Sequence, residues 1–113
     1  MSEESEKVEE EKQATSNSEK DGWSPSFDCY FQDLPEKIQK SVRKAIRMYE
    51  ESPRAKGLML HRLKDNKRGS HFDGSWSVRV NQQYRAIFVI VNGKALWYWV
   101  GTHNDYNRFS GDS

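Results

Sequence analysis

Cysteine and long apolar runs are scarce in this sequence, and both absences limit where the protein can reside. A single cysteine, Cys29, excludes an intramolecular disulfide and favours a reducing compartment. No run in the sequence approaches the roughly 18 apolar residues of a membrane span. Residues 1–22 also lack the apolar core of a secretory signal. We therefore expect a cytoplasmic protein that makes no contact with a membrane.

Several motifs that would indicate a metal or nucleophilic site are missing as well. The three histidines, His61, His71 and His103, show no zinc-ligand spacing with one another or with Cys29. The sequence has no glycine-rich phosphate loop, no internal repeat and no nucleophile motif in its required context. We therefore expect neither a metal site nor a cofactor. With 113 residues, the chain can form a single domain at most.

Charge is distributed unevenly along the chain. Residues 1–22 contain eight acidic and three basic side chains, whereas the remaining residues contain nine acidic and fifteen basic ones. Apart from Met1, Val8 is the only large apolar residue of the acidic segment, so this segment cannot bury enough surface to offset the entropy cost of ordering. We predict a disordered acidic tail over residues 1–22 and a basic folded domain over residues 23–113.

The segment over residues 75–107 predicts three antiparallel strands in a meander that ends in a polar stretch. Asn92-Gly93 between two apolar runs is typical of a type I′ turn, because both central positions of that turn need a positive φ. The turn predicts these pairs across the last two strands: Phe88 with Trp97, Ala86 with Trp99 and Arg85 with Val100. Trp97 and Trp99 would then face the core together, and Tyr98 would lie on the opposite face.

Side-chain alternation predicts the register of the preceding pair of strands. Apolar residues recur at every second position, namely Trp76, Val78, Val80, Tyr84, Ala86, Phe88 and Ile90. Only a register that keeps these positions together gives one continuous apolar face. It places Arg79 directly opposite Arg85 on the other face. Like charges about 5 Å apart repel by about 0.8 kcal/mol in water and about 3 kcal/mol at an effective dielectric of 20. We interpret the pair as a site for an anion, unless solvent or local carboxylates neutralise it.

A helix is predicted before the sheet. Asp33 is its expected N-cap, with Glu36 in the capping-box position, and the helix runs to about Glu51 because Ser52-Pro53 ends it. Its apolar stripe, expected on the even-numbered face of the sheet, is formed by Ile38, Val42, Ala45, Ile46 and Tyr49. A basic stripe, either a solvated face or a surface that attracts polyanions, is formed by Lys37, Lys40, Lys44 and Arg47.

The segments on either side of this helix are less distinctive. Residues 27–31 fit an edge strand or a first helical turn equally well. Residues 58–63 predict a further strand, and residues 65–74 predict a loop from their glycines and charges. The basic residues at the start of that loop, which would border the same anionic site as Arg79, are Lys64, Lys67 and Arg68.

The order of these motifs resembles the RelE/ParE superfamily of type II toxin–antitoxin toxins over about residues 27–109. The resemblance is carried by Ser77-Val78-Arg79-Val80, Tyr84-Arg85-Ala86 and Gly101-Thr102-His103 with Tyr106. The last part is similar to the W-x-G-(S/T)-H-x-x-Y-D signature of one branch, except that Asn107 replaces the acidic residue. The acidic tail has no counterpart in the family pattern. The resemblance therefore explains neither a carboxylate role at position 107 nor residues 1–22.

The resemblance implies a small α+β fold, in which a helix packs on one face of a mostly antiparallel sheet of about four strands. RelE-like members are metal-independent endoribonucleases that cut mRNA, typically on the ribosome, and thereby inhibit translation. ParE-like members instead poison DNA gyrase through protein contacts. A cognate antitoxin neutralises both kinds and is therefore an expected partner. A third alternative is a non-catalytic module that only binds an antitoxin.

RNA cleavage of this kind would give the gathered residues distinct roles. Attack of a ribose 2′-hydroxyl on its own phosphate needs a base, cations and an acid. Histidine is suited to acid–base work at neutral pH, so we expect His103 to be the acid–base group and Arg79 and Arg85 to stabilise the phosphate. Tyr106, three residues after His103, would donate a hydrogen bond or orient the imidazole. The expected RNA-binding residues are Arg62, Lys64, Lys67, Arg68 and Tyr98, of which the last would either stack on a base or simply cover the sheet.

Overall fold

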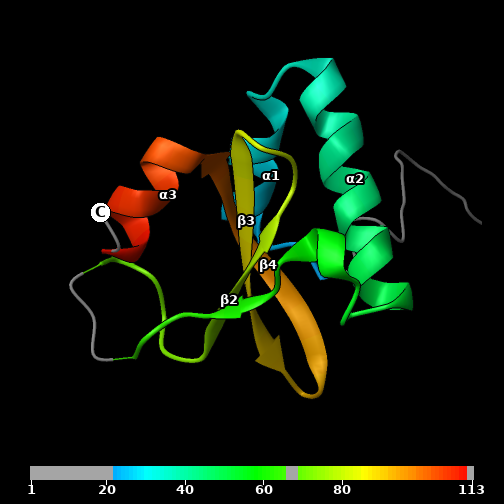
Figure 1. Ribbon diagram of the computed structural model, residues 1–113. Coiled ribbons are helices and arrows are strands. Elements are labelled where there is room, and N and C mark those ends of the chain that lie inside the picture. The colour runs from blue at the N-terminus through cyan, green and yellow to red at the C-terminus, as the bar shows by residue number, and fades with distance from the viewer. Residues whose placement is uncertain (1–21, 66–68, 112–113) are drawn as a thin grey trace, which may run out of the picture.

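A computed structural model describes residues 22–65 and 69–111 (Figure 1). The described elements, in chain order, are α1 (Pro25–Gln32), α2 (Glu36–Glu51), the 3-10 helix η2 (Lys56–Leu58), β1 (His61–Arg62), β2 (Ser75–Arg79), β3 (Tyr84–Val91), β4 (Lys94–Thr102) and α3 (His103–Ser110). The described strands form one antiparallel sheet in the order β1-β2-β3-β4. The expected α+β fold with about four antiparallel strands is confirmed.

The β3–β4 hairpin forms where its turn residues predict it. Asn92-Gly93 has φ values of 52° and 80°, and Val91 pairs with Lys94 across the turn. β2 and β3 also pair in the expected register, which sets Arg79 opposite Arg85. Both predictions are confirmed because turn chemistry and side-chain alternation are local properties of the sequence.

One extra residue in β4 changes the pairing beyond the hairpin. The observed pairs on the two sides of this bulge are Phe88 with Trp97, Ile87 with Trp99, Ala86 with Val100 and Arg85 with Gly101. The predicted partners of Trp99 and Val100 are therefore wrong by one residue. A bulge interrupts strict alternation, and it places Trp97 and Trp99 in different hydrophobic clusters on the two faces of the sheet. The prediction that both tryptophans face one core is wrong for Trp99.

The first face of the sheet carries the larger core and is covered by α1 and α2 (Figure 1). The predicted apolar stripe of α2 packs there, with Val42, Ala45 and Ile46 buried and with Ile38 and Tyr49 packed against them. Burial of each large apolar side chain contributes about 1.5–3 kcal/mol. The buried members from the other elements are Phe27, Phe31, Leu58, Val78, Ala86, Phe88, Trp97 and Val100.

The helices begin at other residues than predicted. Residues 27–31 belong to α1, which Ser24 caps by accepting a hydrogen bond from a backbone N–H of the first turn at 3.2 Å. Asp33 follows the last residue of α1 as its C-cap, so its predicted role as the N-cap of the long helix is wrong. Pro35 occupies that position without a side-chain hydrogen bond, and α2 ends at Glu51 as expected.

The strand predicted over residues 58–63 is much shorter in the structure. Leu58 ends η2, and Met59 adopts a left-handed conformation with φ of 47°. A left-handed residue interrupts an extended backbone, so only His61 and Arg62 pair with β2. β1 is therefore a short strand at the edge of the sheet.

The second face of the sheet is partly covered by α3 (Figure 1). A smaller core lies beneath this helix and consists of Leu63, Ile87, Tyr98, Trp99 and Tyr106, with Val89 and Phe109 packed against them. α3 starts directly after β4, so its first turn lies at the end of the sheet where β2 ends and β3 begins. That end of the second face carries the residues of functional interest.

The described chain starts at the outer edge of β4. The Trp97 N–H donates to the Gly22 carbonyl at 2.7 Å, and the Ser24 N–H donates to the Trp97 carbonyl at 2.9 Å. Gly22 therefore contacts the folded domain, one residue before its predicted start. The rest of the predicted acidic tail, residues 1–21, lies outside the described residues, so its disorder stays a prediction. In the described ranges, no helix has the length and apolar character needed to cross a membrane.

Candidate functional site

Two arginines lie opposite each other where β2 ends and β3 begins. Arg79 and Arg85 are Cα partners, as the sequence predicts. Arg79 Nη1 donates to Met59 Sδ at 3.3 Å, and Arg85 Nη1 donates to the carbonyl oxygens of Asn81 and Tyr84 at 2.9 and 3.1 Å. All of these acceptors are neutral. Within residues 22–65 and 69–111, neither arginine forms an ion pair with a carboxylate.

The electrostatics of this pair favour a bound anion. Burial lowers the pKa of Arg85 and the charge of Arg79 lowers it further, whereas Tyr106 raises it. A guanidinium group nevertheless stays protonated in proteins, so both side chains are cations. Like charges directly opposite in a sheet destabilise it, by about 0.8 kcal/mol at a separation of about 5 Å in water. A ligand with negative charge between the two groups would remove that cost.

The first turn of α3 brings a histidine to the same end of the sheet. Thr102 caps this helix by accepting a hydrogen bond from the Asp105 N–H at 3.1 Å, and the His103 N–H donates to the Gln83 carbonyl at 2.7 Å. These two bonds fix the helix start over the β2–β3 connection. The His103 side chain is exposed, and its ring lies 6.1 Å from the Tyr106 ring with 15° between their planes.

Tyr106 joins α3 to the strand that carries the first arginine. Its side chain is buried, and its hydroxyl lies 3.1 Å from Ser77 Oγ in a buried hydrogen bond. Tyr106 also interacts electrostatically with Arg85. The sequence reasoning missed Ser77, although its position two residues before Arg79 on the same strand face was an available signal. Arg85 thus interacts electrostatically with Arg79 and Tyr106, Ser77 is hydrogen-bonded to Tyr106, and the His103 ring lies next to the Tyr106 ring.

Arg62, a predicted RNA-binding residue, does not lie with the two arginines. Arg62 lies with its guanidinium 5.9 Å from the ring centre of Trp76, which belongs to the core of the first face, and it pairs with Asp65. It therefore lies on the face away from the two arginines. Lys64 is exposed in the loop that follows, while Lys67 and Arg68 lie outside the described residues. Among the residues that are described, no group of three or more His, Cys, Asp or Glu side chains is arranged to hold a metal ion.

Tyr98 lies on the second face, as predicted, but within its core. Its hydroxyl accepts a hydrogen bond from the Phe72 N–H at 3.0 Å and lies 2.7 Å from Ser75 Oγ. Its ring packs 4.7 Å from the Phe72 ring and 6.2 Å from the Phe109 ring. These contacts agree with the expectation that Tyr98 covers the sheet, and they leave little of its ring open to a base.

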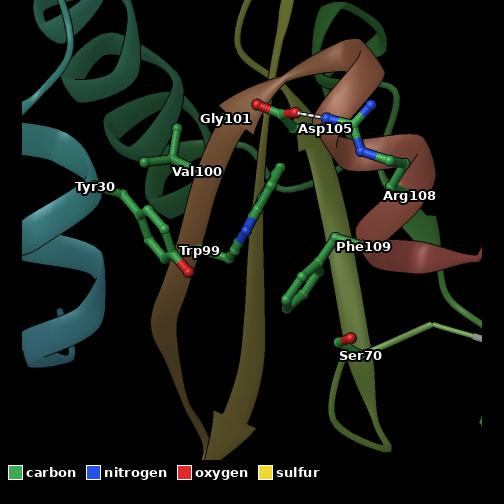
Figure 2. Close-up of a pocket in the computed structure, with 8 residues that line it drawn as sticks. All are labelled: Tyr30, Ser70, Trp99, Val100, Gly101, Asp105, Arg108 and Phe109. Carbon is green, nitrogen blue, oxygen red and sulfur yellow. Dashed lines mark hydrogen bonds and ion pairs between the residues drawn. The ribbon is translucent and has the colours of Figure 1, made fainter.

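A cavity of about 350 Å³ lies between α1 and α3 (Figure 2). The stacked rings of Trp99 and Phe109, 5.0 Å apart, form one wall, and the ion pair between Asp105 and Arg108 lies at its edge. Gly101 leaves room for the indole, because a Cβ at this position would lie 2.8 Å from the Trp99 ring. The complete lining is Tyr30, Ser70, Trp99, Val100, Gly101, Asp105, Arg108 and Phe109. None of Arg79, Arg85, His103 and Tyr106 contributes to this lining.

Comparison with known proteins identifies relatives of this fold. The profile of a family described as the ParE-like toxin domain matches residues 36–108. A solved YoeB–YefM complex from Staphylococcus aureus is similar with a TM-score of 0.53 and 21% identity, over 72% of this chain and 92% of that chain. A YoeB/ParE toxin from Agrobacterium tumefaciens has a TM-score of 0.47 and 18% identity, over 68% of this chain and 95% of that chain. A search of curated proteins gives no match. The likeness to the Staphylococcus aureus structure shows a shared fold.

Proposed function

The chain belongs to the ParE-like toxin domain family, and from this premise we propose that it cleaves mRNA as the toxin of a type II toxin–antitoxin system. The observation that carries the proposal is the arginine pair of β2 and β3, whose acceptors in the described chain are all neutral and which lies at the end of the sheet where the exposed His103 begins α3. A phosphodiester supplies the anion that two adjacent guanidinium groups favour. Histidine supplies proton transfer near neutral pH.

Each residue of this group has a role in the proposed reaction. Arg79 and Arg85 hold the phosphate oxygens by charge-assisted hydrogen bonds and stabilise the charge that develops during attack. His103 transfers a proton at the reacting phosphate, an effect that contributes roughly 10²–10⁴-fold to rate. Tyr106 holds the first turn of α3 against the sheet through its hydrogen bond to Ser77 and thereby keeps the imidazole near the arginines.

Expression of the full chain in bacteria tests the proposal directly. Wild-type protein should arrest translation and leave mRNA fragments with new 5′ ends, whereas His103→Ala should reduce cleavage by roughly 10²–10⁴-fold. Arg85→Ala should reduce it by roughly 10²–10³-fold. Lys94→Ala, at the exposed start of β4 in the turn region, is the matched control and should cleave as the wild type does. Intact mRNA in cells that express the wild-type protein would contradict the proposal.

Inhibition of DNA gyrase is the second candidate, and the family description favours it because it names ParE. In that case the basic surface meets protein or DNA and no RNA is cut. The same cells would then show a DNA-damage response with intact mRNA. Because growth inhibition would not depend on RNA cleavage, loss of proton transfer in His103→Ala would not relieve it. Following mRNA ends and a DNA-damage reporter in one culture therefore separates the two functions.

An antitoxin is the proposed protein partner. The Staphylococcus aureus relative is described as a complex of YoeB with YefM, which supports a partner of this kind for the present chain. The product of a short reading frame next to this gene should co-purify with the protein and restore growth. His103→Ala should keep that binding, because partner contact does not require proton transfer. If wild type and variant both bind but neither cleaves RNA nor damages DNA, the chain is a non-catalytic binding module.

A further inference from the structure

A second histidine lies on the same face of the sheet as the arginine pair. His61 of β1 is the Cα partner of Ser77 of β2, and side chains directly opposite each other in paired strands point to the same face. That face is the one beneath α3, because the Ser77 hydroxyl contacts Tyr106. Leu63, two residues after His61, is also buried in the core under α3. The short strand thus directs His61 toward the site.

The position of His61 leaves its imidazole open to a substrate. β1 is the edge strand of the sheet, and His61 is exposed. In the part of the chain that the structure describes, this side chain has no hydrogen-bond or ion-pair partner. Diagonal neighbours in an antiparallel pair are about 7–8 Å apart, a distance that the long side chain of Arg79 can span. The charged or titratable groups on the elements that pack beside His61 include Arg79 from β2, two residues after its partner Ser77, and Tyr106 from α3, which contacts Ser77. Lys64 and Asp65 follow His61 in the same segment.

The proposed cleavage needs two proton transfers in one step, and the group around the arginines offers His103 for only one of them. Neither arginine of that group pairs with a carboxylate in the described ranges, so we assign the second transfer to another residue. We propose that His61 is the general base that accepts the proton of the attacking ribose 2′-hydroxyl, while His103 is the general acid. This inference rests on the proposed nuclease function.

The step balances without any further reactant. The 2′-oxygen forms a bond to phosphorus and the bond from phosphorus to the 5′-oxygen breaks. The proton of the 2′-hydroxyl passes to His61, and a proton from His103 passes to the leaving 5′-oxygen. The products are a 2′,3′-cyclic phosphate and a 5′-hydroxyl. Because one histidine must be neutral and the other protonated, the cleavage rate should follow a bell-shaped dependence on pH.

Two RNA substrates distinguish the roles of the histidines. The first has an ordinary phosphodiester at the cleavage position, and the second has sulfur in place of the leaving 5′-oxygen, so that its departure needs no acid. Each RNA is given to the full-length protein both as free RNA and as the mRNA of a ribosome complex. Single-turnover cleavage rates are then measured as a function of pH. The variants are His61→Gln, His103→Gln and the control Lys94→Gln, each checked by thermal unfolding.

We expect His61→Gln to lower the rate by roughly 10²–10⁴-fold on both substrates and to remove the acidic limb of the pH profile. His103→Gln should be equally impaired on the ordinary RNA, should lose the alkaline limb, and should recover on the sulfur substrate. Lys94→Gln should match the wild type throughout. The assignment of His61 as the base is overturned if His61→Gln cleaves at the wild-type rate, or if the sulfur substrate restores the activity of this variant. In both cases the proposed nuclease function stands. If the wild-type protein cuts neither RNA, both are overturned.

Discussion

Arg79 and Arg85 lie directly opposite each other on β2 and β3, and in the described ranges neither guanidinium group pairs with a carboxylate. Their hydrogen-bond acceptors are a methionine sulfur and two backbone carbonyls, none of which offsets a positive charge. The folded chain therefore retains a local repulsion that contributes nothing to its stability. In a phosphate-binding surface the same arrangement is favourable, because the two cations act together on one ligand.

Replacement of Arg79 by glutamine should separate stability from function. It removes the cross-strand repulsion, so the free energy of unfolding should stay constant or rise by up to about 0.8 kcal/mol. RNA cleavage should fall by roughly 10²–10³-fold, because one group that stabilises the phosphate is lost. Urea unfolding and cleavage rates on one preparation measure both effects. A variant that is clearly destabilised and cleaves normally would show that Arg79 has a structural role.

The hydrogen bond between Ser77 and Tyr106 should be measurable as a coupling energy. Ser77→Ala and Tyr106→Phe should each lower the free energy of unfolding by about 0.5–1.5 kcal/mol. The double variant should cost less than the sum of the two, because the same buried hydrogen bond is removed only once. Urea unfolding of the four proteins gives this difference. Strict additivity would mean that the two hydroxyls do not stabilise each other.

Gly101→Ala should destabilise the domain. The added methyl group would lie 2.8 Å from the Trp99 indole, whose present position is held by burial and by stacking on Phe109. Overpacking of this kind costs about 1–3 kcal/mol. Gly57→Ala is the matched control, since a Cβ there meets nothing within 4 Å. Equal thermal stability of the two variants would show that β4 adjusts to the larger residue without cost.

Tyr49 should make the protein sensitive to alkaline pH. Burial raises the pKa of Tyr49 above its usual value of 10.0, so the unfolded chain loses this proton before the folded chain does. Its contribution to stability is therefore fully present below the unfolded pKa and is lost as the pH rises through the folded pKa. Tyr49→Phe should reduce the decline in the free energy of unfolding above about pH 10. Tyr30→Phe, at an exposed position, is the control. If the free energy of unfolding falls equally with pH in both variants, Tyr49 does not cause the alkaline sensitivity.

The sequence predicts the structure well where the controlling forces are local. Asn92-Gly93 determines the hairpin through its positive φ values, and side-chain alternation alone aligns Arg79 with Arg85. The N-cap of α2 could not be predicted in the same way. Asp33 is unavailable because α1 ends there, and the choice between helix and strand for residues 27–31 depends on their packing against the sheet.

The candidate site is only partly visible from the sequence. His103 and Tyr106 are found because one helical turn separates them, and the structure places their rings 6.1 Å apart. Ser77 is missed although the register of β2 with β3 places it on the face of Arg79. His61 is missed because its position depends on the pairing of β1 with β2, and a strand of two residues is too short to predict. Tyr98 is placed on the correct face, but its burial depends on Phe72 and Phe109, which are distant in the chain.

The bulge in β4 has a consequence for how relatives of this protein are aligned. A homologue whose last strand lacks the extra residue must be shifted by one position between Tyr98 and Thr102 if its side chains are to be compared with these. An alignment without that gap would match residues of one sheet face with residues of the other face over the end of β4, up to His103. Insertion or deletion of one residue here would therefore alter which side chains accompany the histidine, without changing any of the site residues themselves.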